Sequence, residues 1–132
     1  MCSVSAVSLA FGAYDEFQLA HRDSTGYVTV SCYGRHGERA AYTLTLSAGN
    51  GSFAYRRMRA PDGATLNYNL YASPARAQVW GDGSGGSVTV SDSYLLGSAA
   101  VTRKYPVYGR LFALQKKPVG VYTDILIATL NY

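Results

Sequence analysis

The sequence predicts an all-β protein, because its composition and patterning favour pleated sheet over helix. Tyrosine and glycine are abundant, with 12 and 14 copies in 132 residues, while charged residues make up only 15%. Such a composition is typical of strands and tight turns. Apolar and polar residues also alternate in several short segments that are separated by turn-forming residues. A chain of this length can bury its own core, so we expect one domain over residues 1–132.

The first two expected strands surround the two cysteines. In "CSVSAVSLAFG", residues 2–12, the apolar parity changes near Ala6, which predicts a β-bulge or a change of sheet at that point. In "GYVTVSCY", residues 26–33, one parity is apolar and is expected to face the core. The residues of that parity are Val28, Val30 and Cys32.

The clearest expected hairpin lies around Asn50 and Gly51. The segment "AYTLTLSAGNGSFAYRRM", residues 41–58, alternates before this dipeptide, and Asn-Gly suits the positive φ angles of a tight turn. Further strands are expected at residues 65–72, 87–91 and 105–113, with "GDGSGG", residues 81–86, as a flexible connector. Seven or so short strands in this length favour an immunoglobulin-like sandwich over a closed barrel.

The final segment, "GVYTDILIATLNY", residues 120–132, is strongly sheet-prone. One parity runs from Tyr122 through Leu126 to Tyr132, and the other includes Ile125 and Ile127, so both faces carry aliphatic side chains. Such a strand needs cover on both faces and a neighbour on each side. The chain supplies no later strand, so the sequence raises the question of what that neighbour is.

The two cysteines are expected to form a disulfide. Cys2 and Cys32 are too few and too far apart for a closed zinc site, and no Cys-x-x-Cys pair exists. A bridge would close a loop of about 30 residues, stabilise the fold by roughly 3 to 4 kcal/mol and hold the Cα atoms about 4.4 to 6.8 Å apart. A disulfide implies an oxidising compartment, but no export leader precedes Cys2. The two observations agree if Met1 replaces a native precursor segment.

Two segments resemble catalytic motifs, and each lacks a required partner. "HRD", residues 21–23, begins like a kinase catalytic loop, but Val28 stands where that loop has asparagine, so we expect a polar loop. "GDGSGG", residues 81–86, is close to the motif around the nucleophile of trypsin-like proteases. The additional Gly83 would displace Ser84 from its oxyanion hole, and the chain is too short for the two barrels of such enzymes. We expect no enzymatic activity.

The remaining chemistry-bearing residues favour no cofactor, metal or nucleic-acid site. His21 and His36, the only histidines, are expected to be exposed loop residues. The net charge is +4, but basic residues cluster only in "RRMR", residues 56–59, and "KK", residues 116–117. We therefore expect no specific nucleic-acid binding. No apolar stretch reaches the roughly 18 residues of a membrane helix, so no membrane insertion is expected.

Several segments together resemble the spore coat protein U domain family, which includes pilins of the archaic chaperone-usher pili of Gram-negative bacteria. The resemblance runs from Cys2 to Tyr132. Its most specific elements are the Cys-x-Val-Ser opening, the "LNYNLY...VWGDG" block and the "G-x-Y-x-D" start of the final strand. It is also carried by "AYTLTLSAGNGSFAYRRM" and "VYGRL".

The resemblance implies an incomplete immunoglobulin-like sandwich of the pilin type, which needs a donor strand from another chain. In the family a strand of a periplasmic chaperone fills the groove beside the final strand, and the N-terminal extension of the next subunit later replaces it. On the matching positions, Leu126, Ala128, Leu130 and Tyr132 are expected to line that groove. Val4 is expected on its opposite wall. The face of the two isoleucines is expected to be covered by a subunit contact or a loop.

The resemblance also predicts a biological role. The expected protein is a structural subunit of a secreted pilus, exported through the periplasm to the cell surface and assembled through an outer-membrane usher. Only Met1 precedes Cys2, so the donor extension is absent from this chain, either because it has been removed or because the native protein is a cap or coat protein. The alternatives are a secreted spore-coat or other surface structural protein, and a tip adhesin domain, although such tips generally add a second domain.

Overall fold

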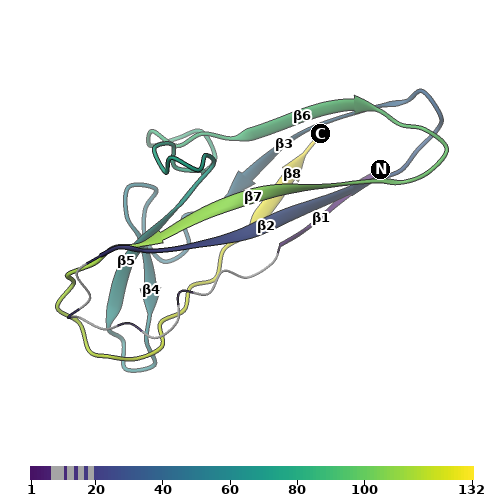
Figure 1. Cartoon of the computed structure of the whole chain (residues 1–132). Coiled ribbons are helices and arrows are strands. Elements are labelled where there is room, and N and C mark those ends of the chain that lie inside the picture. Colours follow the sequence, from purple (N-terminus) through teal and green to yellow (C-terminus); the bar gives the residue numbers. More distant parts are fainter. Residues whose placement is uncertain (7–10, 12–13, 15–16, 18–19) are drawn as a thin grey trace.

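The computed structural model describes residues 1–132 apart from 7–10, 12–13, 15–16 and 18–19. In this described part every regular element is a β-strand (Figure 1), which confirms the all-β prediction. None of the described residues belongs to a helix long and apolar enough to cross a lipid bilayer. In chain order the strands are β1 (Cys2–Ala6), β2 (Arg22–Cys32), β3 (Arg39–Leu46), β4 (Arg56–Arg59), β5 (Thr65–Tyr71), β6 (Val90–Leu95), β7 (Val101–Leu111) and β8 (Ala128–Asn131).

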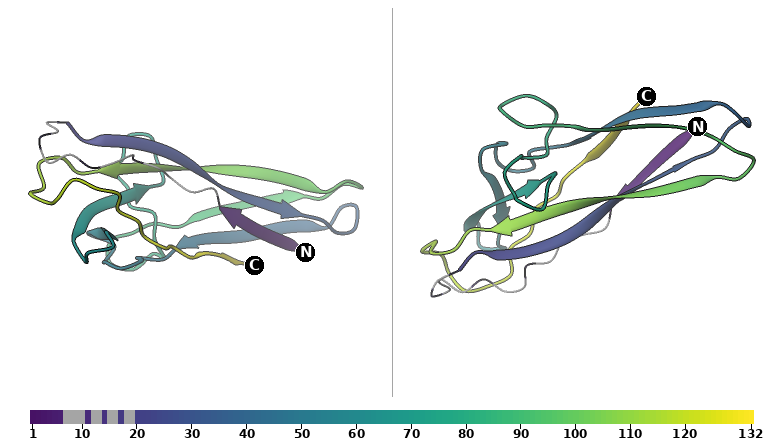
Figure 2. Two further views of the ribbon diagram at one scale, coloured as in Figure 1. Left: turned by 90° about the horizontal axis from the view of Figure 1, so that it is seen from below. Right: turned by 45° about the horizontal axis from the view of Figure 1, so that its top comes forward.

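The strands form two antiparallel sheets, one with the order β1-β2-β7-β5-β4 and the other with the order β6-β3-β8. The longest pairing joins β2 and β7, from Arg22 opposite Leu111 to Cys32 opposite Val101. Both strands run the length of an elongated molecule, and both chain termini lie at the same end of it (Figures 1 and 2). The arrangement is the immunoglobulin-like sandwich that the sequence predicts.

The core follows the alternation of the strands. In β2 the predicted parity is buried, with Val28, Val30 and Cys32 at most 1% exposed. Each fully buried aliphatic side chain contributes about 1.5 to 3 kcal/mol through the apolar area that it removes from water. The same pattern in the other strands completes one core cluster. Its further members include Tyr42, Leu44, Leu46, Leu66, Tyr68, Leu70, Trp80, Val107 and Leu111.

The prediction of a hairpin at Asn50 and Gly51 is wrong, although a turn does occur there. The Gly51 N–H donates to Ala48 O at 3.3 Å, and the positive φ of 61° belongs to Gly49. The strands on either side of the turn enter different sheets, because β3 pairs with β6 and β8 whereas β4 pairs with β5. The local hairpin joins β4 to β5 instead, through a turn in which Gly63 has φ 93°.

Several other elements begin or end at different residues in the structure than the sequence predicts. The "HRD" segment is not a loop, because Arg22 and Asp23 belong to β2 and Asp23 accepts from Arg110 of β7 at 2.9 Å. The strand expected at 87–91 begins only at Val90. The strand expected at 105–113 is β7, which begins four residues earlier and ends two earlier. The expected change of parity after Ala6 lies outside the described residues.

A disulfide joins Cys2 and Cys32, and it ties β1 to β2. The two residues are direct partners in the antiparallel register. Their Cα atoms are 4.0 Å apart, which is shorter than the expected 4.4 to 6.8 Å. Met1 and Tyr33 next to them exchange backbone hydrogen bonds of 2.7 and 2.9 Å. The cysteines therefore occupy a non-hydrogen-bonded position, where opposing Cα atoms approach most closely.

A buried arginine holds the two sheets together near β4. Arg56 is fully buried and donates to Ser47 O at 2.8 Å, to Trp80 O at 2.6 Å and to Asn69 Oδ1 at 2.8 Å. Trp80 Nε1 in turn donates to Leu44 O of β3 at 3.1 Å. This network gives a physical reason for the "LNYNLY...VWGDG" block, because Asn69 and the Trp80 carbonyl in it accept hydrogen bonds from the Arg56 guanidinium.

Tyrosines close one long side of the sandwich. Tyr105 of β7 donates to the Asp92 carboxylate of β6 at 2.6 Å, and Arg103 donates to the same oxygen at 2.8 Å. The Tyr42 hydroxyl of β3 contacts the Tyr105 hydroxyl and lies 3.1 Å from that of Tyr94. These contacts join the three-stranded sheet to the five-stranded sheet on the β6 and β7 side.

Candidate functional site

The other side of the sandwich has two unpaired strand edges. Within the described residues, β1 pairs only with β2 and β8 pairs only with β3, so each strand ends its own sheet. The two edges lie next to each other in the views of Figures 1 and 2. A hollow separates them, and its lining consists of Cys2, Ser3, Val4, Ala128, Thr129, Leu130, Asn131 and Tyr132.

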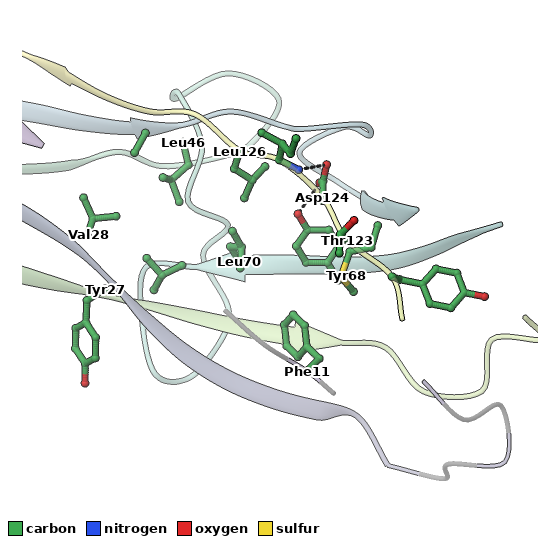
Figure 3. A pocket seen from close by; sticks show the side chains of 14 residues that line it. Phe11, Tyr27, Val28, Leu46, Tyr68, Leu70, Thr123, Asp124 and Leu126 are labelled. Atoms are coloured by element: carbon green, nitrogen blue, oxygen red, sulfur yellow. Dashed lines mark hydrogen bonds between the residues drawn. The ribbon is translucent and has the colours of Figure 1, made fainter. Parts of the chain in front are cut away.

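A deeper apolar groove continues from this hollow between the two sheets. It has a volume of about 470 Å³ and is shown in Figure 3. Side chains from both sheets and from the C-terminal segment line it, including Phe11, Val28, Leu46, Leu70, Val107, Leu126 and Ala128. Tyr27 also borders the groove, but it is 41% exposed and its ring points away from the interior (Figure 3).

The C-terminal segment crosses from one sheet to the other along this groove. Thr123 exchanges backbone hydrogen bonds of 2.7 and 2.9 Å with Arg59 of β4. Ile127 then accepts from the Ser47 N–H at 3.0 Å, just beyond the end of β3. Only from Ala128 onward does the segment pair continuously. The strand expected from residue 122 is therefore an extended crossing followed by the short β8.

The alternation expected for the C-terminal segment is present. Tyr122 is buried and Leu126 and Leu130 are half-buried, whereas Ile125 and Ile127 are 84% and 65% exposed. No described part of this chain covers the two isoleucines.

The backbone of this segment also alternates, which leaves hydrogen-bonding groups on the open edge. Ile127 directs its backbone toward Ser47. Neighbouring residues of an extended chain direct their N–H and C=O groups to opposite sides. The backbone groups of Leu126, Ala128 and Leu130 therefore face the open edge, where the described residues provide no partner strand.

Asp124 fixes the segment at the deep end of the groove. Its carboxylate accepts from the Tyr68 hydroxyl at 2.6 Å and from the Asn50 N–H at 3.2 Å. Burial, followed by the hydrogen bond to this carboxylate, raises the pKa of Tyr68 well above its usual value. A Cβ atom at Gly49 would collide with the Asp124 carboxylate, so the turn must approach this side chain without one.

Tyr122 and Gly120 hold the start of the C-terminal segment in place. Tyr122 packs edge-on against Tyr14 with ring centroids 6.3 Å apart, and its hydroxyl donates to Pro118 O at 2.7 Å. Gly120 O accepts from the Tyr14 N–H at 3.0 Å. The "G-x-Y-x-D" motif therefore anchors the last segment at its glycine, its tyrosine and its aspartate before the segment reaches the open edge.

The structure brings the five residues expected to line a groove to the same side of the sandwich. Val4, Leu130 and Tyr132 border the hollow between β1 and β8, Leu126 lines the deeper groove, and Ala128 borders both. Tyr132 is 76% exposed, so it lies at the rim.

Sequence reasoning assigned no groove role to four residues that line it: Phe11, Tyr68 and Leu70 of β5, and Asp124 of the C-terminal segment itself. The one available signal was Asp124, because a carboxylate within an otherwise apolar parity indicates a specific partner.

Fold and site together define an immunoglobulin-like sandwich with one open, apolar side. The chain belongs to the Spore Coat Protein U domain family, which matches it over residues 1–129.

Among solved structures, the chain is similar to one chain of the CsuC-CsuE chaperone-tip adhesion subunit pre-assembly complex from archaic chaperone-usher Csu pili of Acinetobacter baumannii. The TM-score is 0.61 and the identity is 18%. The match covers 100% of this chain and 39% of that chain, so this chain spans well under half the length of that neighbour. A comparison with curated proteins found no match.

Proposed function

We propose that this chain is a structural subunit of a surface pilus and that a strand from another chain completes its sandwich. The observation that carries the proposal is the pair of unpaired edges, β1 and β8, on either side of one apolar groove. Family membership and the likeness to a chain from an archaic chaperone-usher pilus support it. An extended peptide that enters such a site gains backbone hydrogen bonds from the edge and specificity from alternate side-chain pockets.

The groove residues have distinct roles in this proposal. Val4 forms one wall, and Leu126, Ala128, Leu130 and Tyr132 form the other. Apolar side chains at every second position of the incoming strand enter the groove, while its backbone pairs with the open edge of β8.

The energy available from such a strand is large for a domain of this size. Four or five inserted apolar side chains at about 1.5 to 3 kcal/mol each give a gross gain on the order of 10 kcal/mol before ordering costs. That gain is comparable to the whole stability of a small domain. The free subunit therefore depends on a partner that supplies the strand.

The partners and the location follow from this mechanism. A periplasmic chaperone supplies the first strand, an outer-membrane usher passes the subunit outward, and a neighbouring subunit supplies the final strand. The Cys2 to Cys32 disulfide suits an oxidising compartment on that route. Residues 1–132 act as a single structural domain that performs no catalysis, holds no cofactor or metal and does not insert into the membrane.

The proposal is tested by thermal unfolding in the presence of a synthetic donor peptide with apolar residues at every second position. At a peptide concentration about 100 times Kd, the added stability is about 2.7 kcal/mol, which raises Tm by roughly 10 °C. A peptide of the same composition with shuffled parity is the control. Unchanged melting at saturating donor peptide, or equal stabilisation by both peptides, contradicts the proposal.

Two aspartate variants locate the bound strand. Leu126→Asp places a charge in the groove and should abolish the response to the peptide. Ile127→Asp changes a neighbouring residue that is 65% exposed and borders neither the groove nor the hollow, so it should leave the response intact. If Leu126→Asp still responds as fully as the parent protein, the peptide binds elsewhere.

A further inference from the structure

The turn of residues 48–51 contains the one Asn-Gly pair of the sequence, and its asparagine side chain is unrestrained. Asn50 is exposed, and its backbone N–H donates to the Asp124 carboxylate at 3.2 Å. Among the described residues, none makes a hydrogen bond to the Asn50 side-chain amide. This carboxamide is therefore free to turn toward the backbone that follows it.

Gly51 presents the backbone nitrogen that can attack this carboxamide. Its N–H donates to Ala48 O at 3.3 Å, which is longer than the roughly 2.7 to 3.2 Å of an ordinary N–H···O bond, so the nitrogen is held weakly. Glycine also has no side chain to shield the nitrogen. A larger residue would not fit here, because a Cβ atom at Gly51 would lie 2.2 Å from Tyr55 O. Packing of the turn therefore requires the glycine that makes Asn50 reactive.

The same turn rests against Asp124, which fixes the C-terminal segment at the deep end of the groove. The Asn50 N–H donates to one oxygen of this carboxylate, and the Tyr68 hydroxyl donates to the other at 2.6 Å. The approach is close, since a Cβ atom at Gly49 would lie 2.3 Å from Asp124 Oδ2. A change of charge or of backbone length at residue 50 therefore acts directly on this contact.

We propose that Asn50 deamidates spontaneously in the folded protein and that the product weakens the contact between the turn and Asp124. The Gly51 nitrogen attacks the side-chain carbonyl carbon of Asn50, and the new C–N bond closes a succinimide ring. The amide nitrogen leaves as ammonia and takes the proton that Gly51 gives up. Water then opens the ring at either of its carbonyls, which yields aspartate or isoaspartate. Water is the only co-reactant, so the step needs no enzyme and no cofactor.

Both products disturb the turn for reasons that its contacts supply. Aspartate places a second carboxylate on the residue that donates to Asp124, and like charges so close together repel each other. Isoaspartate also adds one methylene to the main chain before Gly51, so the turn cannot keep both its reversal and its close approach to Asp124. Deamidation should therefore loosen the deep end of the groove. The inference uses only this turn and Asp124, so it does not depend on the pilus proposal.

The first test follows deamidation of the native protein at mildly alkaline pH by peptide mass spectrometry, with digestion at acidic pH. Asn131 is the internal control, because it is also exposed but is followed by the bulky Tyr132. Asn50 should convert about tenfold or more faster than Asn131, and its rate should rise with pH because the attacking nitrogen must lose a proton. Equal rates at the two asparagines overturn the proposal. Conversion of Asn50 only after unfolding in urea overturns it as well.

The second test measures what the product does to the fold. The deamidated protein carries one more negative charge, so ion exchange separates it from the parent protein. Its Tm should be lower by about 4 °C, and the Thr123 N–H, which donates to Arg59 O at 2.9 Å, should exchange faster with solvent. Unchanged melting together with unchanged exchange at Thr123 would show that the product leaves the turn in contact with Asp124, against the proposal.

Three variants separate the chemistry from the charge. Asn50→Gln must close a larger ring, so it should stay unconverted and melt with the parent protein. Asn50→Asp supplies the aspartate product alone and should lower Tm in the same direction as deamidation. Gln78→Glu makes the same amide-to-acid change at an exposed residue outside the turn, and its Tm should stay within about 1 °C of the parent. Equal effects of Asn50→Asp and Gln78→Glu would mean that net charge, not the contact with Asp124, explains the loss.

Discussion

Arg56 is a buried cation whose hydrogen bonds go to uncharged oxygens. Burial lowers the pKa of its guanidinium, while the nearby Tyr68 and Asp124 act in the opposite direction. The cost of burying the charge is offset because the guanidinium donates to Ser47 O, Trp80 O and Asn69 Oδ1. The same residue joins β4 to the segments that follow β3 and β5, so one side chain sets where the chain changes sheet.

At the residue scale we predict that Arg56→Met destabilises the protein by about 3 kcal/mol, because it leaves buried carbonyl and amide oxygens without a donor. Arg57→Met on the same strand is the matched control and should cost within about 0.5 kcal/mol, since that side chain is exposed. Urea unfolding of both variants measures the difference. Equal stabilities would show that the Arg56 network contributes little.

The sequence reveals some residues of the site and hides others for a physical reason. Period-two alternation places Leu126 and Leu130 on one face of an extended segment, but the other face carries Ile125 and Ile127, so only the resemblance to the family predicted which face lines the groove. Tyr68 could not be assigned to the groove, because its contact with Asp124 joins residues 56 positions apart. No local pattern encodes such a contact, which depends on how the two sheets are stacked.

At the scale of elements, the turn after β3 shows that the local sequence can indicate a turn without indicating the sheet topology around it. The Asn-Gly dipeptide correctly indicates a reversal of the chain. It cannot indicate which sheet the next strand joins, and that choice depends on the burial of Arg56 and on the pairing of β4 with β5. The same limit applies to the C-terminal segment, whose crossing from Arg59 to Ser47 leaves a short β8 where a continuous strand was expected.

The tyrosines that join β3, β6 and β7 predict an alkaline loss of stability. Burial is the main cause that raises the pKa values of Tyr42, Tyr94 and Tyr105 to about 12 each. In the unfolded chain tyrosine ionises near pH 10. Between about pH 10 and 12 the folded protein keeps protons that the unfolded chain has released, so the free energy of unfolding should fall as pH rises through this window. Below about pH 9 these groups should have no effect.

Urea unfolding at successive pH values between 8 and about 12 measures this effect. The variant with Tyr42→Phe and Tyr105→Phe removes two of the ionising groups, so its stability should decline less steeply with pH. A free energy of unfolding that stays constant to about pH 12, or an unchanged slope in the variant, would contradict the role of this cluster.

At the scale of the whole molecule, the sandwich is asymmetric. One long side is closed by the hydrogen bonds among β3, β6 and β7, and the other exposes the edges of β1 and β8 beside an apolar groove. Soluble proteins rarely leave such an edge uncovered, because it pairs readily with other chains. The opening thus accounts for the aliphatic side chains of the C-terminal segment, which border a groove beside an edge that no described strand covers.

The most direct test of the open edge is amide hydrogen exchange of residues 122–131, with and without the alternating donor peptide. The backbone N–H groups of Leu126 and Leu130 should exchange rapidly in the free protein, whereas that of Val30, in the interior of β2, should be protected. At about 100 times Kd the peptide should slow the exchange of Leu126 and Leu130 by about 100-fold. Strong protection of these two amides in the free protein, or no change on saturation with peptide, would show that the sandwich is already complete.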